Sequence, residues 1–512
     1  MQNKQKYSEK VHTAINIITG IVVMMVNLGI SFFVSPYIVE TLGEEANGFT
    51  QLANNFVMYA SLFTIAFNSM AGRFISVNYH RGNMEKVSQY YSSIIVCNIL
   101  LITLLIPVFV YIVINLPQLI NIQNADIIDV KILFTCVFVN FLINLLVSVF
   151  NIAMYVKNML FIQNTISLIK SIASAVFVCT LFVVFPPKIF YTSIVEVVLV
   201  VFVVICVAYF HRKVMPELKF RVADFKWQAV RDMLSAGIWN TINQCGNLLM
   251  TGMDLLVTNL FISPSAMGVL AAAKTVPTAI TSLATTLNAN LAPSLTIAWA
   301  NGDTKALLQK LRSGMKISSI IVSIPYMVFC AFGKEFYTLW MPSLDAELLT
   351  LLSFLTCLAL VPWSGPQVLN NIFSAANRLK VSTITFFIAG LINIGVVYVL
   401  LKNTDLGIIA VAGVSSVITI IRCFTVIAPY IAYLLKVKWY TFYKDAAMSV
   451  LCSALNFALA RGVHFFIKGE SWITLFIAVA ISAILTLAVD MMIILSKGER
   501  EYLFSRISAL KR

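Results

Sequence analysis

Apolar segments long enough to cross a membrane recur along the whole of this 512-residue chain. Crossing the hydrocarbon core of a bilayer takes about 20 mainly apolar residues. Segments of this kind lie near residues 14–39, 48–73, 89–114, 131–154, 160–184, 189–209, 234–261, 266–298, 316–333, 348–373, 381–401, 406–435, 446–467 and 471–495. With 60% hydrophobic and 11% charged residues, a soluble globular fold is excluded. We therefore predict an all-α polytopic membrane protein with about fourteen transmembrane helices.

The lysines and arginines of the connecting segments predict the orientation of these helices. If the N-terminus is cytoplasmic, most of the basic residues fall on the inner side. The outer side then receives only Lys131, Lys188, Lys334, Lys402, Arg461 and Lys468. The net charge of +14 is spread in short clusters between apolar runs, which indicates contact with membrane lipids rather than with nucleic acid. We expect both termini to be cytoplasmic.

An internal repeat emerges when the chain is slid against itself by 220 residues. The matching positions are Gly48 with Gly268, Asn68 with Asn288, Gly82 with Gly302, and, without a gap, Asn151–Ile152 with Asn371–Ile372. Because six spans separate each element from its copy, we expect two six-helix lobes related by a pseudo-twofold axis along the membrane normal. The predicted divisions are an N-lobe with a cytoplasmic linker at 1–231, a C-lobe at 232–445, and two further helices with a cytoplasmic tail at 446–512.

Basic residues inside the predicted spans are candidates for binding an anionic substrate. A charged side chain at a helix centre costs about 2.5–3.5 kcal/mol on insertion scales and usually faces the protein interior. Lys170 and Arg422 lie near the middle of their spans, Lys274 lies in the outer half of its span, and Arg73 closes a span at its inner end. Such groups bind phosphate oxygens well. The alternative is that each is paired internally or extends to the membrane surface.

Acidic residues inside the spans are candidates for coupling transport to an ion. Asp254 and Glu196 are the two main examples, and a carboxylate shielded from water can take up H⁺ or bind Na⁺. Asp254 and Lys274 fall in the outer halves of consecutive spans, so a structural ion pair between them is an equal alternative. Asp490 lies close to the inner end of the last span, where we expect it to be interfacial.

Amide side chains form a third group of candidates. Asn243 and Asn247 share one face of a predicted helix with Asn240 and Gln244, and Asn68 and Asn288 occupy matching positions of the repeat. Amides on a wet wall suit the hydroxyl groups of sugars, whereas amides facing a neighbouring helix bond the two helices together. Both interpretations remain open for each residue.

The sequence contains no pattern typical of a metal or cofactor site. All nine cysteines fall within predicted spans without a Cys-x-x-Cys pair, and the four histidines are widely separated. We predict no catalytic residue, no metal and no cofactor.

Three short motifs carry a resemblance to a known family. They are SPYIVETLGEEANGF at Ser35–Phe49, NSMAGRF at Asn68–Phe74 and YHRGN at Tyr79–Asn83. With the arrangement of six, six and two spans, the chain resembles the MOP superfamily and, within it, the Wzx-like flippases of the polysaccharide transporter branch.

The resemblance implies a bacterial inner-membrane protein with a V-shaped cavity between two lobes. It would move an undecaprenyl-pyrophosphate-linked oligosaccharide to the periplasmic leaflet by alternating access, in company with other polysaccharide assembly proteins. Lys170, Lys274 and Arg422 are similar in character to the family's cationic cavity residues.

Two other functions are weighed against this one. A MATE-like, cation-coupled multidrug exporter of the same superfamily should have a net acidic cavity. Here the predicted spans contain three deep basic residues and two acidic ones. A membrane-embedded polysaccharide polymerase or ligase needs reactive groups near the outer face, but the predicted outer connections are short and carry no acid–base cluster. We therefore expect a transporter and not an enzyme.

Overall fold

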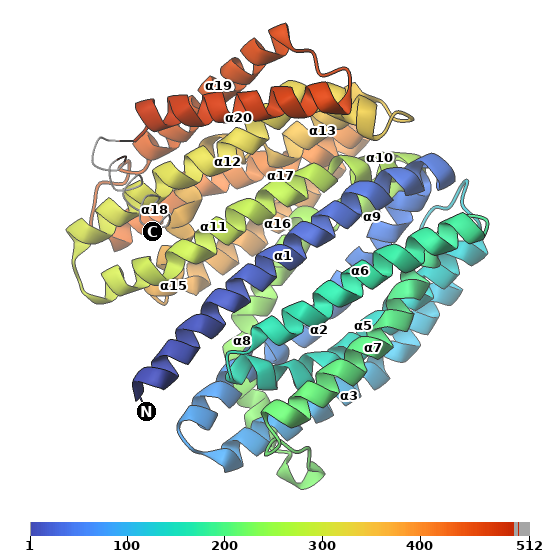
Figure 1. Ribbon diagram of the computed structural model, residues 1–512, viewed down its shortest axis with the longest axis vertical. Coiled ribbons are helices and arrows are strands. Elements are labelled where there is room, and N and C mark those ends of the chain that lie inside the picture. The colour runs from blue at the N-terminus through green and yellow to red at the C-terminus, as the bar shows by residue number, and fades with distance from the viewer. Residues whose placement is uncertain (1, 496–499, 501–512) are drawn as a thin grey trace. The chain divides into compact units, whose positions relative to one another are not determined.

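The computed structural model describes residues 2–495 and residue 500, and its side chains are described from residue 15 onwards, apart from residue 17. Within these residues the chain forms helices and short connections, with no β-strand (Figure 1). The predicted all-α fold is therefore confirmed. Two compact units are present: unit 1 contains residues 1–248 and 255–268, and unit 2 contains residues 249–254 and 269–512.

Unit 1 is built from the first half of the chain. Its helices are α1 (Gln2–Leu42), α2 (Glu44–His80), α3 (Met84–Ile114), α4 (Leu116–Leu119), α5 (Ile127–Val156), α6 (Leu160–Val184), α7 (Tyr191–Val214), the short 3₁₀ turn η1 (Val222–Asp224), α8 (Trp227–Asn247) and most of α9 (Asp254–Phe261). Helix α1 packs along α6, α5 along α7, and α2 along both α5 and α8. Large apolar side chains such as Phe67, Tyr91 and Val149 fill the core between these helices.

Unit 2 contains the remaining helices. The π-helical turn η2 (Leu248–Gly252) and α10 (Pro264–Ala273) join it to unit 1 along the chain. Its other elements are α11 (Thr275–Ala300), α12 (Thr304–Trp340), α13 (Ala346–Cys357), α14 (Leu360–Trp363), η3 (Pro366–Leu369), α15 (Asn370–Ala375), α16 (Leu379–Asn403), α17 (Ile408–Arg422), the π-helical turn η4 (Cys423–Ile427), α18 (Ala428–Leu434), α19 (Tyr443–Phe466) and α20 (Trp472–Ile493). Helices α12, α19 and α20 pack against one another (Figure 1).

Each predicted span coincides with one helix or with a run of consecutive helices. In the described residues, ten helices are long and apolar enough to cross a membrane, or eleven with the bent pair α10–α11. The other segments are α2, α8 with α9, and α13 to α15. These are amide-rich or broken into short pieces, which lowers their hydropathy without shortening the path of the chain. The structure is therefore consistent with about fourteen spans.

The backbone repeats the same turn after α2 and after α11. These helices end at His80 and Ala300, 220 residues apart. Gly82 and Gly302 follow with φ angles of 74° and 71°. Asn83 and Asp303 then cap the next helix, accepting hydrogen bonds from the backbone N–H groups of Lys86 and Ala306. The predicted internal repeat is thus visible in the backbone.

The gapless offset, however, is wrong beyond this turn. The next pair of capping residues, Asp126 and Asp345, is 219 residues apart, as are Asn158 and Asn377, with φ angles of 55° and 52°. The second copy is therefore one residue shorter between the two caps. The match of Asn151–Ile152 with Asn371–Ile372 is out of register by that one residue.

Replacing Gly82 or Gly302 by alanine is expected to lower the free energy of unfolding by about 1 kcal/mol, because L-residues rarely adopt a positive φ. Replacement by asparagine, which tolerates this conformation, should have a smaller effect. Thermal unfolding of the purified variants measures both. Equal losses for alanine and asparagine would show that the left-handed backbone is not the cause.

The compact units do not divide the chain at the predicted boundary between 231 and 232. Helix α8 packs on α2 in unit 1, where a Cβ atom added to Gly237 would lie 1.5 Å from the carbonyl oxygen of Ala66. Helices α19 and α20 belong to unit 2 through their packing on α12. The division into two lobes by repeat stays a prediction. Most of the predicted cytoplasmic tail, residues 496–499 and 501–512, lies outside the described residues, as does residue 1.

Candidate functional site

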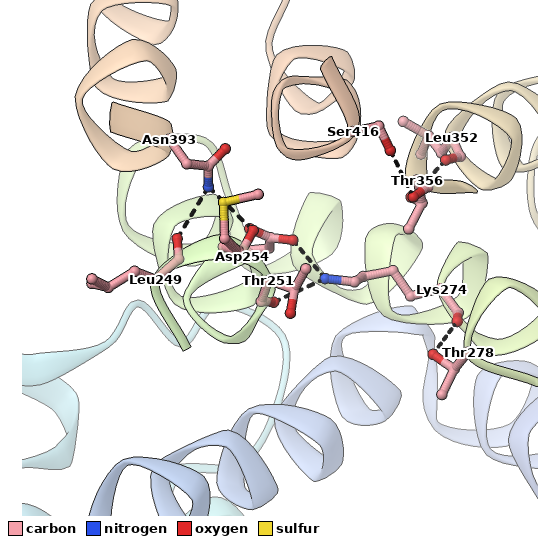
Figure 2. Close-up of polar contacts among 10 residues, drawn as sticks. Leu249, Thr251, Asp254, Lys274, Thr278, Leu352, Thr356, Asn393 and Ser416 are labelled. Carbon is pink, nitrogen blue, oxygen red and sulfur yellow. Dashed lines mark hydrogen bonds and ion pairs between the residues drawn. The ribbon is translucent and has the colours of Figure 1, made fainter. Parts of the chain in front are cut away.

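Two consecutive spans are interrupted at residues that belong to unit 2, near an ion pair. Between α8 and α9 the chain widens into the π-helical turn Leu248–Gly252, and between α10 and α11 it bends by 41° at Lys274. Widening a helix frees backbone carbonyl groups, which must find partners when water is absent. Figure 2 shows that side chains from neighbouring elements reach these carbonyls.

Lys274 and Asn393 supply the missing partners. The Lys274 Nζ donates to the Thr251 carbonyl oxygen at 3.1 Å and pairs with Asp254 Oδ2 at 2.6 Å. The Asn393 Nδ2 of α16 donates to the carbonyl oxygens of Leu249 and Met250, both at 3.1 Å (Figure 2). The Lys274 and Asp254 side chains are only 17% and 8% exposed. The ion pair left open by the sequence is therefore present, and it ties the two interrupted spans together.

A second ion pair lies in unit 1. Lys170 of α6 pairs with Glu196 Oε2 of α7, and Ser174 Oγ donates to Glu196 Oε1 at 2.9 Å. Glu196 lines a cavity of about 430 Å³ between α2, α5 and α7. The other polar groups of its lining are Thr50, Asn54, Asn140, Asn144, Thr192 and Ser193. The Thr192 hydroxyl is buried without a hydrogen-bond partner, so this cavity has polar capacity that the protein itself does not use.

The two ion pairs do not match position for position in the repeat, although polar residues beside them do. Asn54 corresponds to Lys274 at the offset of 220, and Ser174 corresponds to Asn393 at the offset of 219. The charges nevertheless come from different elements. In unit 1 both come from unbroken helices, whereas in unit 2 both come from residues beside helix interruptions. Matching the two copies by sequence therefore does not relate one ion pair to the other.

Arg422 is held by neutral groups of α16. Its Nη2 donates to the Ser382 carbonyl oxygen at 3.0 Å, and its guanidinium stacks over the Phe386 ring with 4.8 Å between the Cζ atom and the ring centroid. No carboxylate among the described residues pairs with it. Ser382 lies in the first turn of α16. The guanidinium thus lies beside the first two turns of α16.

Asn68 and Asn288, the matched amides, have different roles. Asn68 exchanges two hydrogen bonds of 3.2 Å with Asn98 of α3, which supports the interpretation that it bonds two helices together. The Asn288 carbonyl oxygen accepts from Asn371 Nδ2 at 3.1 Å, and its side-chain oxygen is buried without a partner. Asn68 and Asn288 therefore occupy matching positions in the repeat, but their side chains make different contacts.

The remaining predicted site residues are scattered. Asn243 is exposed and Asn247 is half-buried on α8, and Asn240 donates to Ser69 Oγ at 3.1 Å. Arg73 is exposed on α2 and does not close it, because the helix continues to His80. In contrast to the expected interfacial position, Asp490 is fully buried.

Asn140 and Asn144, which line the unit 1 cavity, are not among the site residues predicted from the sequence. Asn144 Nδ2 donates to Asn140 Oδ1 at 3.0 Å. Their spacing of four residues within an apolar run was a usable signal, because it places both amides on one face of a helix. Among the described residues, no group of three or more His, Cys, Asp or Glu side chains is arranged to hold a metal ion.

Residues 14–299 match the family described as polysaccharide biosynthesis protein. The chain belongs to this family. One relative by sequence is the uncharacterized membrane protein EpsK of Bacillus subtilis. It is 27% identical over 97% of this chain and 98% of its own length.

Solved structures of the MOP superfamily share the fold of this polysaccharide biosynthesis protein. The lipid II flippase MurJ, in an inward closed conformation, is 15% identical and matches with a TM-score of 0.64 over 93% of this chain and 98% of MurJ. An inward-facing multidrug resistance MATE family transporter is 12% identical and matches with a TM-score of 0.63 over 87% of this chain and 98% of the transporter. The fold expected from the resemblance to this superfamily is confirmed, and these two proteins are named as a flippase and a transporter.

Proposed function

We propose that this protein is a flippase for an undecaprenyl-pyrophosphate-linked oligosaccharide in the inner membrane of a bacterium. It moves its substrate from the cytoplasmic to the periplasmic leaflet by alternating access, and H⁺ or Na⁺ drives the exchange. Both termini lie in the cytoplasm. The match of residues 14–299 to the polysaccharide biosynthesis family carries this proposal. The fold shared with a protein named as a lipid II flippase supports it.

The polar groups of unit 1 support a sugar-containing substrate. Asn54, Asn140 and Asn144 present amide groups to a cavity of about 430 Å³ within the spans. Amides both donate and accept hydrogen bonds, as sugar hydroxyl groups do. We propose that Asn68, Asn243, Asn247 and Asn288 add further contacts along the path of the glycan.

Arg422 is the strongest candidate for binding the pyrophosphate. Lys170 and Lys274 are already paired with carboxylates, whereas Arg422 has only neutral partners in the described residues. We propose that Arg422 and the exposed Arg73 receive the phosphate groups first. Lys170 and Lys274 then join when their ion pairs open, and Asp254 and Glu196 bind the coupling H⁺ or Na⁺ in the same step.

Arg422→Glu is expected to abolish transport while the protein remains in the membrane. Arg422→Ala should reduce transport about ten- to a hundredfold, since a hydrogen bond to a charged group contributes about 1.5–3 kcal/mol. Arg422→Lys, which keeps the charge but loses the planar fork, should retain intermediate activity. Equal transport by all four proteins would remove Arg422 from the site.

Reconstituted vesicles test the function itself. Purified protein is placed in vesicles that contain an undecaprenyl-pyrophosphate-linked glycan with a fluorescent sugar, and a membrane-impermeant glycosidase reports its transfer between leaflets. We expect the wild-type protein to accelerate transfer relative to vesicles without protein. With the Arg422→Glu variant, transfer should be no faster than in vesicles without protein. Export of a cationic dye without any glycan transfer would favour the multidrug exporter, whose case rests on the shared fold alone.

A further inference from the structure

A line of buried polar side chains runs between α12 and the two helices that follow the repeat, α19 and α20. We call it the polar seam; it consists of Ser319 and Ser323 of α12, Ser449, Cys452 and Asn456 of α19, and Ser482, Thr486 and Asp490 of α20. Ser482, Thr486 and Asp490 follow one another at intervals of four residues, so they lie on one face of α20. None of these eight residues is more than 2% exposed, and the three on α20 are fully buried.

Asp490 supplies the carboxyl group of the polar seam, and its hydrogen-bond partners among the described residues are neutral. Its Oδ2 accepts from Asn456 Nδ2 at 2.9 Å and from Cys452 Sγ at 3.3 Å. Its Oδ1 is buried without a hydrogen-bond partner. No lysine, arginine or histidine among the described residues contacts this carboxyl group, and Cys452 is the one titratable side chain that faces it.

The other two carboxyl groups considered for ion coupling differ from Asp490 in this respect. Glu196 is paired with Lys170, and Asp254 is paired with Lys274. An ionised carboxylate in an apolar interior is far less stable than a neutral carboxylic acid unless a cation balances it. Asp490 has an amide and a thiol where the other two have an ammonium group, so its carboxyl group is more stable with a proton than without one.

A route for that proton leads from the predicted cytoplasmic side. A cavity of about 290 Å³ is lined by the charged residues Arg312, Lys316, Lys444 and Asp445, and also by Ser319 and Ile494. Ile494 lies one helical turn beyond Asp490, since its backbone N–H donates to the Asp490 carbonyl oxygen at 2.9 Å. The cavity thus reaches the base of the polar seam.

Hydroxyl and thiol groups continue the route inwards. Ser319 Oγ lies 2.7 Å from Ser449 Oγ. One turn further along α12, Ser323 Oγ lies 3.1 Å from Cys452 Sγ, which in turn contacts Asp490. Each of these groups can donate one hydrogen bond and accept another, so the two pairs can pass a proton once a water molecule or a side-chain rotation bridges the turn between them.

We propose that Asp490 is a proton-binding site that exchanges with water in the basic cavity through the polar seam. A hydronium ion gives up its proton to the Asp490 carboxylate and leaves as water, so no other reactant is needed. Helices α19 and α20 thereby carry a protonation site separate from the ion pairs of the repeat. This proposal does not rest on the proposed flippase function.

Infrared spectroscopy of the full-length protein in lipid nanodiscs tests the proposal without any substrate. We expect a carbonyl stretch of a protonated carboxylic acid at neutral pH, shifted by ¹³C-labelling of aspartate and shifted again in D₂O. Asp490→Asn should remove this band, since asparagine has the shape of the protonated acid but no acidic proton. Asp254→Asn is the matched control and should leave the band in place.

Two results would overturn the proposal. One is a wild-type spectrum without an aspartate-dependent band of a protonated acid at neutral pH, which needs no variant. The other is a band that persists in Asp490→Asn. Should Asp490→Asn fail to fold, Cys452→Ser serves instead: a change of the donor to Oδ2 should shift the frequency of the band, and an unchanged frequency would contradict the assignment to Asp490.

Discussion

Replacing Lys274 by methionine is expected to lower the free energy of unfolding by about 3–5 kcal/mol, because it leaves the Asp254 carboxylate buried without its cation. The change also removes the donor to the Thr251 carbonyl oxygen at the π-helical turn. Both losses fall at the contact between two interrupted spans. We therefore expect transport to be lost together with stability.

Lys334→Met is the matched control. Lys334 also pairs with a carboxylate, Glu347, but the two side chains are 60% and 72% exposed. Exposed ion pairs contribute about 0–1 kcal/mol. Chemical or thermal unfolding in detergent compares the two variants, and a similar loss for both would show that burial does not strengthen the Lys274–Asp254 pair.

The double variant Lys274→Met, Asp254→Asn separates the pair from its surroundings. Replacing both charges of a buried pair by neutral groups is often close to neutral for stability. We expect this variant to recover much of the stability lost by Lys274→Met alone. Transport should remain impaired, because the carboxylate that we propose to bind the coupling ion is gone. A double variant no more stable than Lys274→Met would mean that the carbonyl contact and not the charge carries the effect.

Replacing Gly237 by alanine is expected to lower the free energy of unfolding by about 3 kcal/mol, at the upper end of the range for overpacked sites. The added Cβ would lie 1.5 Å from the Ala66 carbonyl oxygen, and a backbone atom of α2 cannot move aside as a side chain can. Helices α2 and α8 must then separate. Thermal unfolding and the amount of protein recovered from the membrane measure the effect.

Gly395→Ala provides the comparison for Gly237→Ala. Gly395 lies inside α16, and an added Cβ there meets nothing within 4 Å. Alanine should raise stability at this position by up to about 1 kcal/mol, because it favours the helix over the unfolded chain. A loss of stability at both positions would show that the close approach of α2 and α8 is not the cause.

Much of the fold followed from local sequence. The runs of apolar residues placed every span, and the turn at Gly82 and Gly302 marked the repeat, since both properties depend on residues that are close together in the chain. The register of the repeat was harder to predict. A one-residue difference between the Asp126 and Asp345 caps changes no hydropathy pattern, so it became visible only from the backbone.

The candidate site was predicted less well than the fold. Lys170, Lys274, Asp254 and Glu196 were recognised as unusual because charges inside a span are unfavourable. Their pairing was left open for both lysines, because contacts between distant segments decide it. The partners of Arg422 come from α16, and its own surroundings in the sequence do not reveal them. The burial of Asp490 was not expected either, because its place near the helix end predicted an interfacial position.

The sequence by itself determined that this is a membrane protein of many helices with an internal repeat, because transfer of apolar residues from water to lipid depends on each segment alone. Only the tertiary structure decided which charges neutralise each other. Lys170 meets Glu196 and Lys274 meets Asp254, whereas within the described part of the chain Asp490 meets only neutral groups. These outcomes depend on which helix faces join, and that choice is made by packing between segments distant in the chain.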